Sequence, residues 1–193
     1  MTRIVAAVAA LLCLVPFASA EKKSKLLENF SKVCGVDVDR PADGVYAKPH
    51  KKSWQQFATV KAVPREGRPE MAQYWQGEHG SLVQMAKHDG SYTRYHEYCF
   101  DDTGKLTRLT YETRAAEGWG YAMTGAMNKS GHLVPASSRF FGVRTNRTMP
   151  RPPEAEQESW VLNPKVYKQR DKLPFAKLMT TPVEQKKQDA QAH

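Results

Sequence analysis

The sequence predicts an α+β protein, in which an N-terminal helix packs on a curved antiparallel β-meander of about five to seven strands and an extended C-terminal tail follows. Three observations predict this class. Residues 80–114 contain three alternating strand-like runs joined by two tight turns. Residues 22–34 have the three- and four-residue apolar spacing of an amphipathic helix. From residue 147 the chain is rich in proline and charge. We therefore expect one domain over residues 21–146 and a partly disordered tail over residues 147–193.

Residues 1–20 are predicted to be a secretory signal peptide. Arg3 supplies the positive start, residues 4–17 form a short apolar core, and residues 18–20 (Ala-Ser-Ala) are a small-x-small cleavage site. No other run approaches the ~20 apolar residues that a membrane-spanning helix needs. The mature chain is therefore expected to be secreted or periplasmic, with no transmembrane segment.

Export changes how the three cysteines are interpreted. Cys13 leaves with the signal peptide, so that Cys34 and Cys99 remain. An even pair in an oxidising compartment favours one disulfide, and two buried free thiols are the alternative. Neither cysteine belongs to a C-x-x-C motif, and no adjacent histidine indicates an activated thiolate.

The predicted helix decides which sheet face is the core. Leu26, Leu27 and Phe30 share its apolar side, and Gly35 follows at a position where helices commonly stop. Cys34 at the end of this helix can reach Cys99 only if the helix covers the face of the odd-numbered meander residues. That face is expected to bury Tyr95, Leu109 and Tyr111, together with Leu82, which the expected register of the first hairpin places on the same side.

Two turns set the expected register of the meander. Asp89-Gly90 favours a two-residue hairpin turn, and Gly104 suits the left-handed position in the second turn. If residue 88 faces 91, Leu82 lies opposite Glu97. If residue 101 faces 105, Glu97 also lies opposite Leu109. A slip by one residue would exchange the two faces.

The remaining elements follow from local patterns. We expect a loop at 36–53 and strands at 54–63, 71–76, 119–127 and 132–145. A helix followed by a curved meander is similar, in shape alone, to cystatin-like and nuclear-transport-factor-like α+β cones. Three apolar islands interrupt the charged tail and are candidates to dock on the body: residues 160–162, 166–167 and 175–179.

The second face of the meander carries the first set of candidate ligand-binding residues. Arg94, His96, Tyr98 and Arg108 are expected to lie there, with Tyr98 opposite Arg108 and Arg94 opposite Glu112. An aromatic patch with guanidinium groups suits a sugar, an anionic ligand or a peptide. The alternatives are ordinary solvated cross-strand pairs, or aromatic residues that the C-terminal tail covers.

Glu97 is the candidate site residue on the opposite face of the sheet, which the helix is expected to cover. A carboxyl group that loses its hydration between Leu82 and Leu109 is a candidate general acid or ligand contact. The alternative is that Glu97 reaches water near a sheet end, or pairs with a basic residue.

Charge and motifs narrow the function classes. The formal net charge of +9 becomes +8 without Arg3, and basic residues are spread along the chain, unlike the concentrated stripe of nucleic-acid binders. The histidines lack zinc-ligand spacing, and no dinucleotide or phosphate-loop fingerprint is present, so we expect no metal and no cofactor.

The sequence therefore favours an exported, non-catalytic envelope protein that binds a small molecule, a glycan or an envelope protein, and no nucleic acid. The first alternative is a small extracytoplasmic hydrolase or isomerase with Glu97 as its acid or base. The second is a structural or inhibitory protein that offers its C-terminal tail to a partner.

Overall fold

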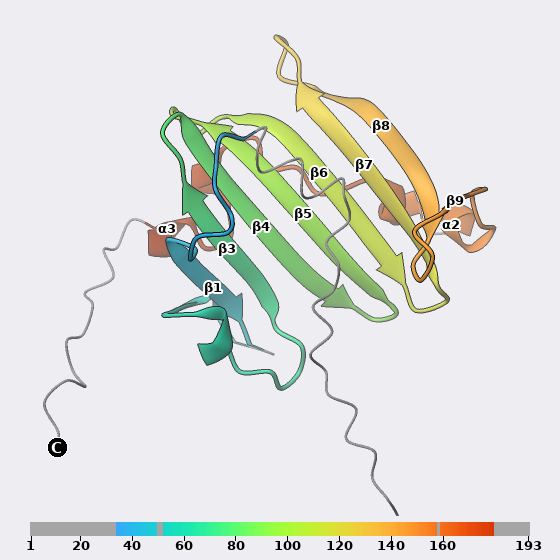
Figure 1. The fold of residues 1–193 in the computed structure, drawn as a ribbon, viewed down its shortest axis with the longest axis horizontal. Helices are drawn as coiled ribbons and strands as arrows, with labels where there is room; N and C mark the ends of the chain where they lie inside the picture. Colours follow the sequence, from blue (N-terminus) through green and yellow to red (C-terminus); the bar gives the residue numbers. More distant parts are fainter. Residues whose placement is uncertain (1–33, 50–51, 158, 180–193) are drawn as a thin grey trace, which may run out of the picture.

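The computed structural model describes residues 34–49, 52–157 and 159–179, and nine strands in these ranges form one antiparallel sheet (Figure 1). The strand order is β2-β1-β3-β4-β5-β6-β7-β8-β9, so each strand from β3 onward pairs with the next along the chain. The strands are β1 (Gly44–Lys48), β2 (Gln55–Phe57), β3 (Glu70–Gln76), β4 (Gly80–Asp89), β5 (Tyr92–Asp101), β6 (Leu106–Ala115), β7 (Trp119–Met127), β8 (Leu133–Gly142) and β9 (Thr148–Met149).

The α+β prediction is wrong, because the regular structure of the described chain is mostly antiparallel β-sheet with only short helices. Its helices have only three or four residues: η1 (Val60–Ala62), α2 (Glu154–Gln157), η2 (Ser159–Leu162), η3 (Arg170–Lys172) and α3 (Ala176–Met179). Residues 22–33 of the expected helix lie outside the described residues. Strand β1 falls in the expected loop, because Pro41 and Pro49 bound a five-residue strand and do not interrupt it.

The hairpin between β4 and β5 keeps the expected faces but shifts the expected pairs by two residues. Asp89 lies opposite Tyr92, so Gly90 and Ser91 form the turn, and Gly90 takes φ +58°. Glu97 therefore lies opposite Gln84, and the expected pairing with Leu82 is wrong. A shift by two preserves which side chains share a face.

A register irregularity between β5 and β6 changes the faces themselves. Phe100 lies opposite Leu106, as the register expected from the turn requires. The next pair is Cys99 with Arg108, because Thr107 is an extra, unpaired residue on β6. Tyr98 consequently faces Leu109, and His96 faces Tyr111. The expectation that Leu109 and Tyr111 share a face with Leu82 and Tyr95 is wrong for this reason. The expected pairs Tyr98–Arg108 and Arg94–Glu112 are wrong as well.

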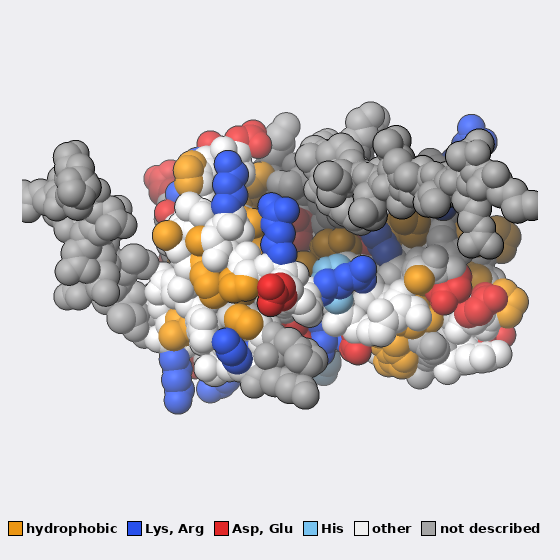
Figure 2. Space-filling model, turned by 90° about the horizontal axis from the view of Figure 1, so that it is seen from below, with side chains coloured by type: hydrophobic (Ala, Val, Ile, Leu, Met, Phe, Trp, Pro, Cys, Tyr) orange, Lys and Arg blue, Asp and Glu red, His pale blue; other side chains and the backbone are white. Residues whose placement is uncertain are grey.

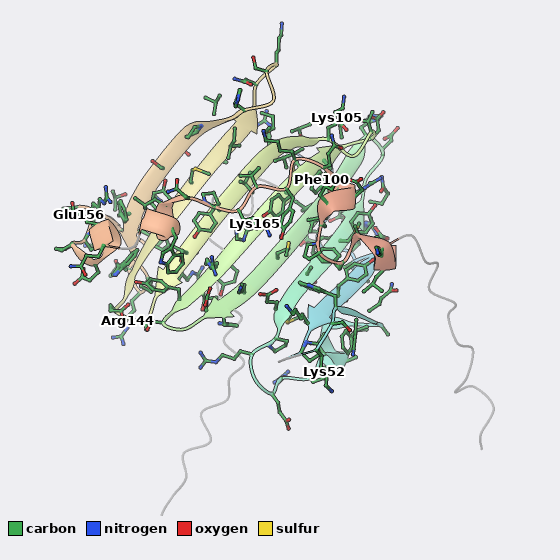
Figure 3. The ribbon with its side chains drawn as sticks, turned by 180° about the vertical axis from the view of Figure 1, so that it is seen from behind. Lys52, Phe100, Lys105, Arg144, Glu156 and Lys165 are labelled. Carbon is green, nitrogen blue, oxygen red and sulfur yellow. A yellow bond between two sulfur atoms is a disulfide. The ribbon has the colours of Figure 1, made fainter. Side chains whose placement is uncertain are left out.

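The C-terminal strap, residues 152–157 and 159–179, covers the sheet face that carries Tyr98, which we call the strap face. Figure 3 shows the strap running from Glu156 beside β8, past Lys165 over the middle of the sheet, to α3 beside β1. Phe175, which is 1% exposed, stacks on Tyr46 with ring centroids 4.8 Å apart. The main hydrophobic core lies between the strap and the sheet, and the tail islands pack into it or against its margin.

The opposite face carries a smaller core at one end, and we call it the disulfide face. Cys34 and Cys99 form a disulfide with Cα atoms 5.6 Å apart, which confirms the predicted link. Val36, Trp75 and Leu82 are buried around it. No helix in the described ranges combines the length and apolarity needed to span a bilayer.

Candidate functional site

A row of polar side chains crosses the disulfide face at right angles to the strands. Its members are successive cross-strand neighbours from β3 to β8: Gln73, Gln84, Glu97, Thr110, Thr124 and Ser137. Two hydrogen bonds lie within it. Gln84 Nε2 donates to Glu97 Oε1 at 2.6 Å, and the hydroxyl oxygens of Thr124 and Ser137 are 3.0 Å apart. This row exists because residues of one parity on each strand share a face.

One end of this polar row forms part of a hollow of about 270 Å³ over β3, β4 and β5. The side chains that line it from the disulfide face are Met71, Gln73, Gln84, Ala86, Tyr95, Glu97 and Arg114. The intervening residues Ala72, Met85 and His96 also line it, and strand alternation turns their side chains to the strap face. The hollow thus combines apolar walls with amide, carboxylate and guanidinium groups.

Two carboxylates are buried on this face. Glu97 is 3% exposed and Glu112 is 1% exposed. They are diagonal neighbours, because Tyr95 lies opposite Glu112 and Glu97 lies opposite Thr110. Arg114 Nε donates to Glu112 Oε1 at 2.6 Å, and its guanidinium lies 5.1 Å from the Tyr95 ring centroid. A charge-assisted hydrogen bond of this kind holds Arg114 at the rim of the hollow.

Of the predicted ligand-binding residues, Glu97 alone presents its side chain to this face of the hollow. Arg94, His96 and Tyr98 point to the strap face, and Arg108 is exposed on the disulfide face opposite Cys99. The structure therefore does not bring the five predicted residues together.

The strap covers the aromatic residues of the predicted outward patch. Tyr98 is 1% exposed and donates its hydroxyl hydrogen to the carbonyl of Lys165 at 2.8 Å. Burial raises the pKa of this phenol well above its usual range. The His96 ring stacks on Tyr98, with centroids 5.7 Å apart, and burial, with a smaller effect from the charge of Arg94, lowers the pKa of His96 to about 3.

The side chain of Arg94, on β5, lies against the strap. It pairs with Asp89, and its guanidinium lies 4.9 Å from the Trp160 ring centroid. The contact with Trp160 is one of the alternatives foreseen for this face, namely that the tail covers the aromatic residues.

Several residues of the hollow were not singled out from the sequence. Gln73 and Gln84 lie on the same sheet face as Glu97, in strands that the sequence places correctly. A polar side chain in the middle of each strand is the signal that could have identified them. Arg114 and Glu112 gave no such signal, because the extra residue in β6 transfers them to the disulfide face.

Basic and acidic side chains are interspersed over the surface seen in Figure 2, with hydrophobic side chains between them. Among the residues that the structure describes, no three His, Cys, Asp or Glu side chains are grouped so that they could hold a metal ion. No protein-family model, curated protein or solved structure matches this chain. The functional argument therefore depends on the geometry of the hollow.

Proposed function

We propose that this is an exported binding protein that holds a small molecule in the hollow of the disulfide face and does not transform it. The observation that carries the proposal is the hollow itself, in which the polar side chains of Gln73, Gln84, Glu97 and Arg114 are set against apolar walls. Concave sites lined mainly by apolar groups, with a few polar groups that fix orientation, are the usual form of ligand sites. A predicted signal peptide and the Cys34–Cys99 disulfide support export.

The side chains indicate the chemistry of the ligand. Glu97 accepts hydrogen bonds, the amides of Gln73 and Gln84 both donate and accept, and Tyr95 and Met71 offer apolar surface. A compact molecule with hydroxyl or amino groups on one side and an apolar face on the other satisfies all of these groups. A single sugar ring has this character, and a volume near 270 Å³ suits one ring better than a chain of rings.

Native mass spectrometry of protein isolated from its own cell envelope tests the proposal. We expect a population with one retained small molecule. Ala86→Phe fills the hollow and should remove the added mass. Ala126→Phe is the matched control, because Ala126 is also a half-buried alanine on the disulfide face but lies on β7, away from the hollow. A bare wild-type protein, or equal loss in both variants, would count against the hollow as the binding site.

One observation favours catalysis as the second candidate. Glu97 lines the hollow with a hydrogen-bonding partner, Gln84, 2.6 Å away, which is the arrangement required of a positioned acid or base. Glu97→Gln separates the two functions. If the protein only binds, this variant should carry the same molecule as the wild type at lower occupancy. If Glu97 is the acid or base of a hydrolase, the variant should retain a molecule of larger mass, namely the uncleaved substrate. If it serves an isomerase, the retained molecule should have the same mass and differ in its NMR spectrum after extraction.

A further inference from the structure

We propose that the strap face holds a small anion, a halide or a carboxylate group, between Arg94, Tyr111 and Thr113. This site is separate from the hollow, because its side chains point to the opposite face of the sheet. Thr113 lies directly opposite Arg94, and Tyr111 lies opposite His96 on the same pair of strands. The strap closes over this part of the sheet, with Trp160 against Arg94.

The site contains hydrogen-bond donors that lack acceptors. Arg94 Nε, Tyr111 Oη and Thr113 Oγ1 are buried and have no hydrogen-bond partner within the described part of the chain. Thr113 is 0% exposed and Tyr111 is 1% exposed. Native proteins rarely leave buried polar groups unsatisfied, so each exception needs a water, an ion or a ligand to explain it.

These three donors are neighbours on the strap face, because Arg94 lies directly opposite Thr113 and diagonal to Tyr111. Burial raises the pKa of Tyr111, while hydrogen bonding by the Thr113 hydroxyl and the charge of Arg94 act in the opposite direction, in agreement with this placement. The two hydroxyls lie within reach of each other, but they do not form a hydrogen bond of normal geometry. A third group placed between them can accept from both.

The charge of the surroundings selects an anion. His96, the neighbour of Tyr111 on this face, is half-buried and has a pKa of about 3, because desolvation, with a smaller effect from Arg94, disfavours its charged form. It is therefore neutral at physiological pH and adds no charge to the site. The carboxylate that pairs with Arg94 is Asp89, which is 51% exposed at the β4–β5 turn and bonds Nη2, leaving Nε to face the interior. A guanidinium N–H and two hydroxyls in a medium of low dielectric constant favour a negatively charged acceptor. Because the Tyr111 and Thr113 side chains are almost completely buried, the acceptor must be small.

Diffraction from crystals grown in sodium bromide tests the site directly. We expect an anomalous peak within hydrogen-bond distance of Arg94 Nε, Tyr111 Oη and Thr113 Oγ1. Ordered water at that position in bromide would overturn the proposal. A parallel experiment in sodium formate, read from the shape of the density, distinguishes a carboxylate from a halide as the preferred anion.

Thermal unfolding supplies a test in solution. In a buffer whose only other anion is a bulky sulfonate, the wild-type Tm should rise with bromide concentration, since a ligand that binds only the folded state stabilises it. Thr113→Val should lose this rise. Thr110→Val is the control, because Thr110 lies on the same strand, is also 0% exposed and also has an unpaired hydroxyl, but faces the other way.

Arg94→Lys keeps the positive charge and removes the Nε donor, and it replaces Thr113→Val if that variant does not fold. It should also lose the bromide response. A response that persists in Arg94→Lys and Thr113→Val, or disappears equally in Thr110→Val, would refute the site.

Discussion

Tyr98 in the centre of β5 donates its hydroxyl hydrogen to the main-chain carbonyl of Lys165, 67 residues later in the sequence, at 2.8 Å. This bond fastens the middle of the strap to the middle of the sheet. It joins two groups that would each lose a water partner on burial, so it helps to explain why a charged, proline-rich segment can lie on an aromatic face.

Tyr98→Phe should lower the free energy of unfolding by about 1 kcal/mol, because the Lys165 carbonyl loses its partner while the ring remains packed. The strap should also become more sensitive to limited proteolysis. Urea denaturation and a protease time course measure the two effects. Tyr167→Phe is the control, since Tyr167 touches the Tyr98 ring on the same face. Equal behaviour of the two variants would show that the Tyr98 hydroxyl does not hold the strap.

Phe175→Ala should be the most destabilising single truncation in the strap. Phe175 is 1% exposed and packs between Tyr46 and Trp54, with centroid distances of 4.8 and 4.9 Å. Removing a buried phenyl ring costs roughly 3–5 kcal/mol, through lost transfer energy and a cavity. Phe57→Ala, at a half-buried ring on the edge strand β2, should cost clearly less. Similar urea midpoints for both variants would contradict the view that the strap completes the main core.

His96 should make stability depend on pH. The imidazole has a pKa near 3 in the folded protein and its ordinary value of 6.5 when unfolded. Between these values the unfolded chain binds more protons, so the free energy of unfolding should fall as the pH drops below 6.5, by up to about 1.4 kcal/mol per pH unit. His96→Phe should have a shallower dependence between pH 6.5 and 4.5. Parallel slopes in urea titrations would mean that His96 is not buried in its neutral form.

Loss of the disulfide should destabilise the fold by up to about 4 kcal/mol on the chain-entropy model, because Cys34 and Cys99 are 65 residues apart. Replacing both residues by alanine removes the link without leaving a free thiol. Urea denaturation of this double variant measures the cost, and intact mass measures the deficit of two hydrogens in the wild type. Two titratable thiols in protein from the native envelope would contradict the pairing.

Local patterns were sufficient to predict several features of this chain. Alternation in residues 80–114 predicted the three strands of the meander, and the count of cysteines after the signal peptide predicted the Cys34–Cys99 link. The expected run at 119–127 matches β7.

Other features depend on interactions that no local pattern encodes. The extra residue at Thr107 cannot be distinguished from regular alternation in the sequence, yet it moves Leu109, Tyr111 and Glu112 to the faces opposite those expected. The strap has few apolar residues in any one window, and its burial becomes visible only when Tyr46 and Phe100 are placed beneath it.

The candidate site was only partly predictable for the same reason. Glu97 was identified because a carboxylate in the middle of an alternating strand is unusual. Gln73 and Arg114 line the same hollow through the pairings β3–β4, β4–β5 and β5–β6. A one-residue error in any of these three registers would place a side chain on the wrong face.

Electron density in the hollow between β3 and β5 is the most direct test of the proposed function. Crystals should be grown from protein extracted from its own envelope, without unfolding or extensive dialysis. We predict density for one compact molecule within hydrogen-bond distance of Glu97 and Gln84, which is absent in Ala86→Phe. A hollow that contains only ordered water in such crystals, with no added mass in the same preparation, would contradict a ligand-binding role.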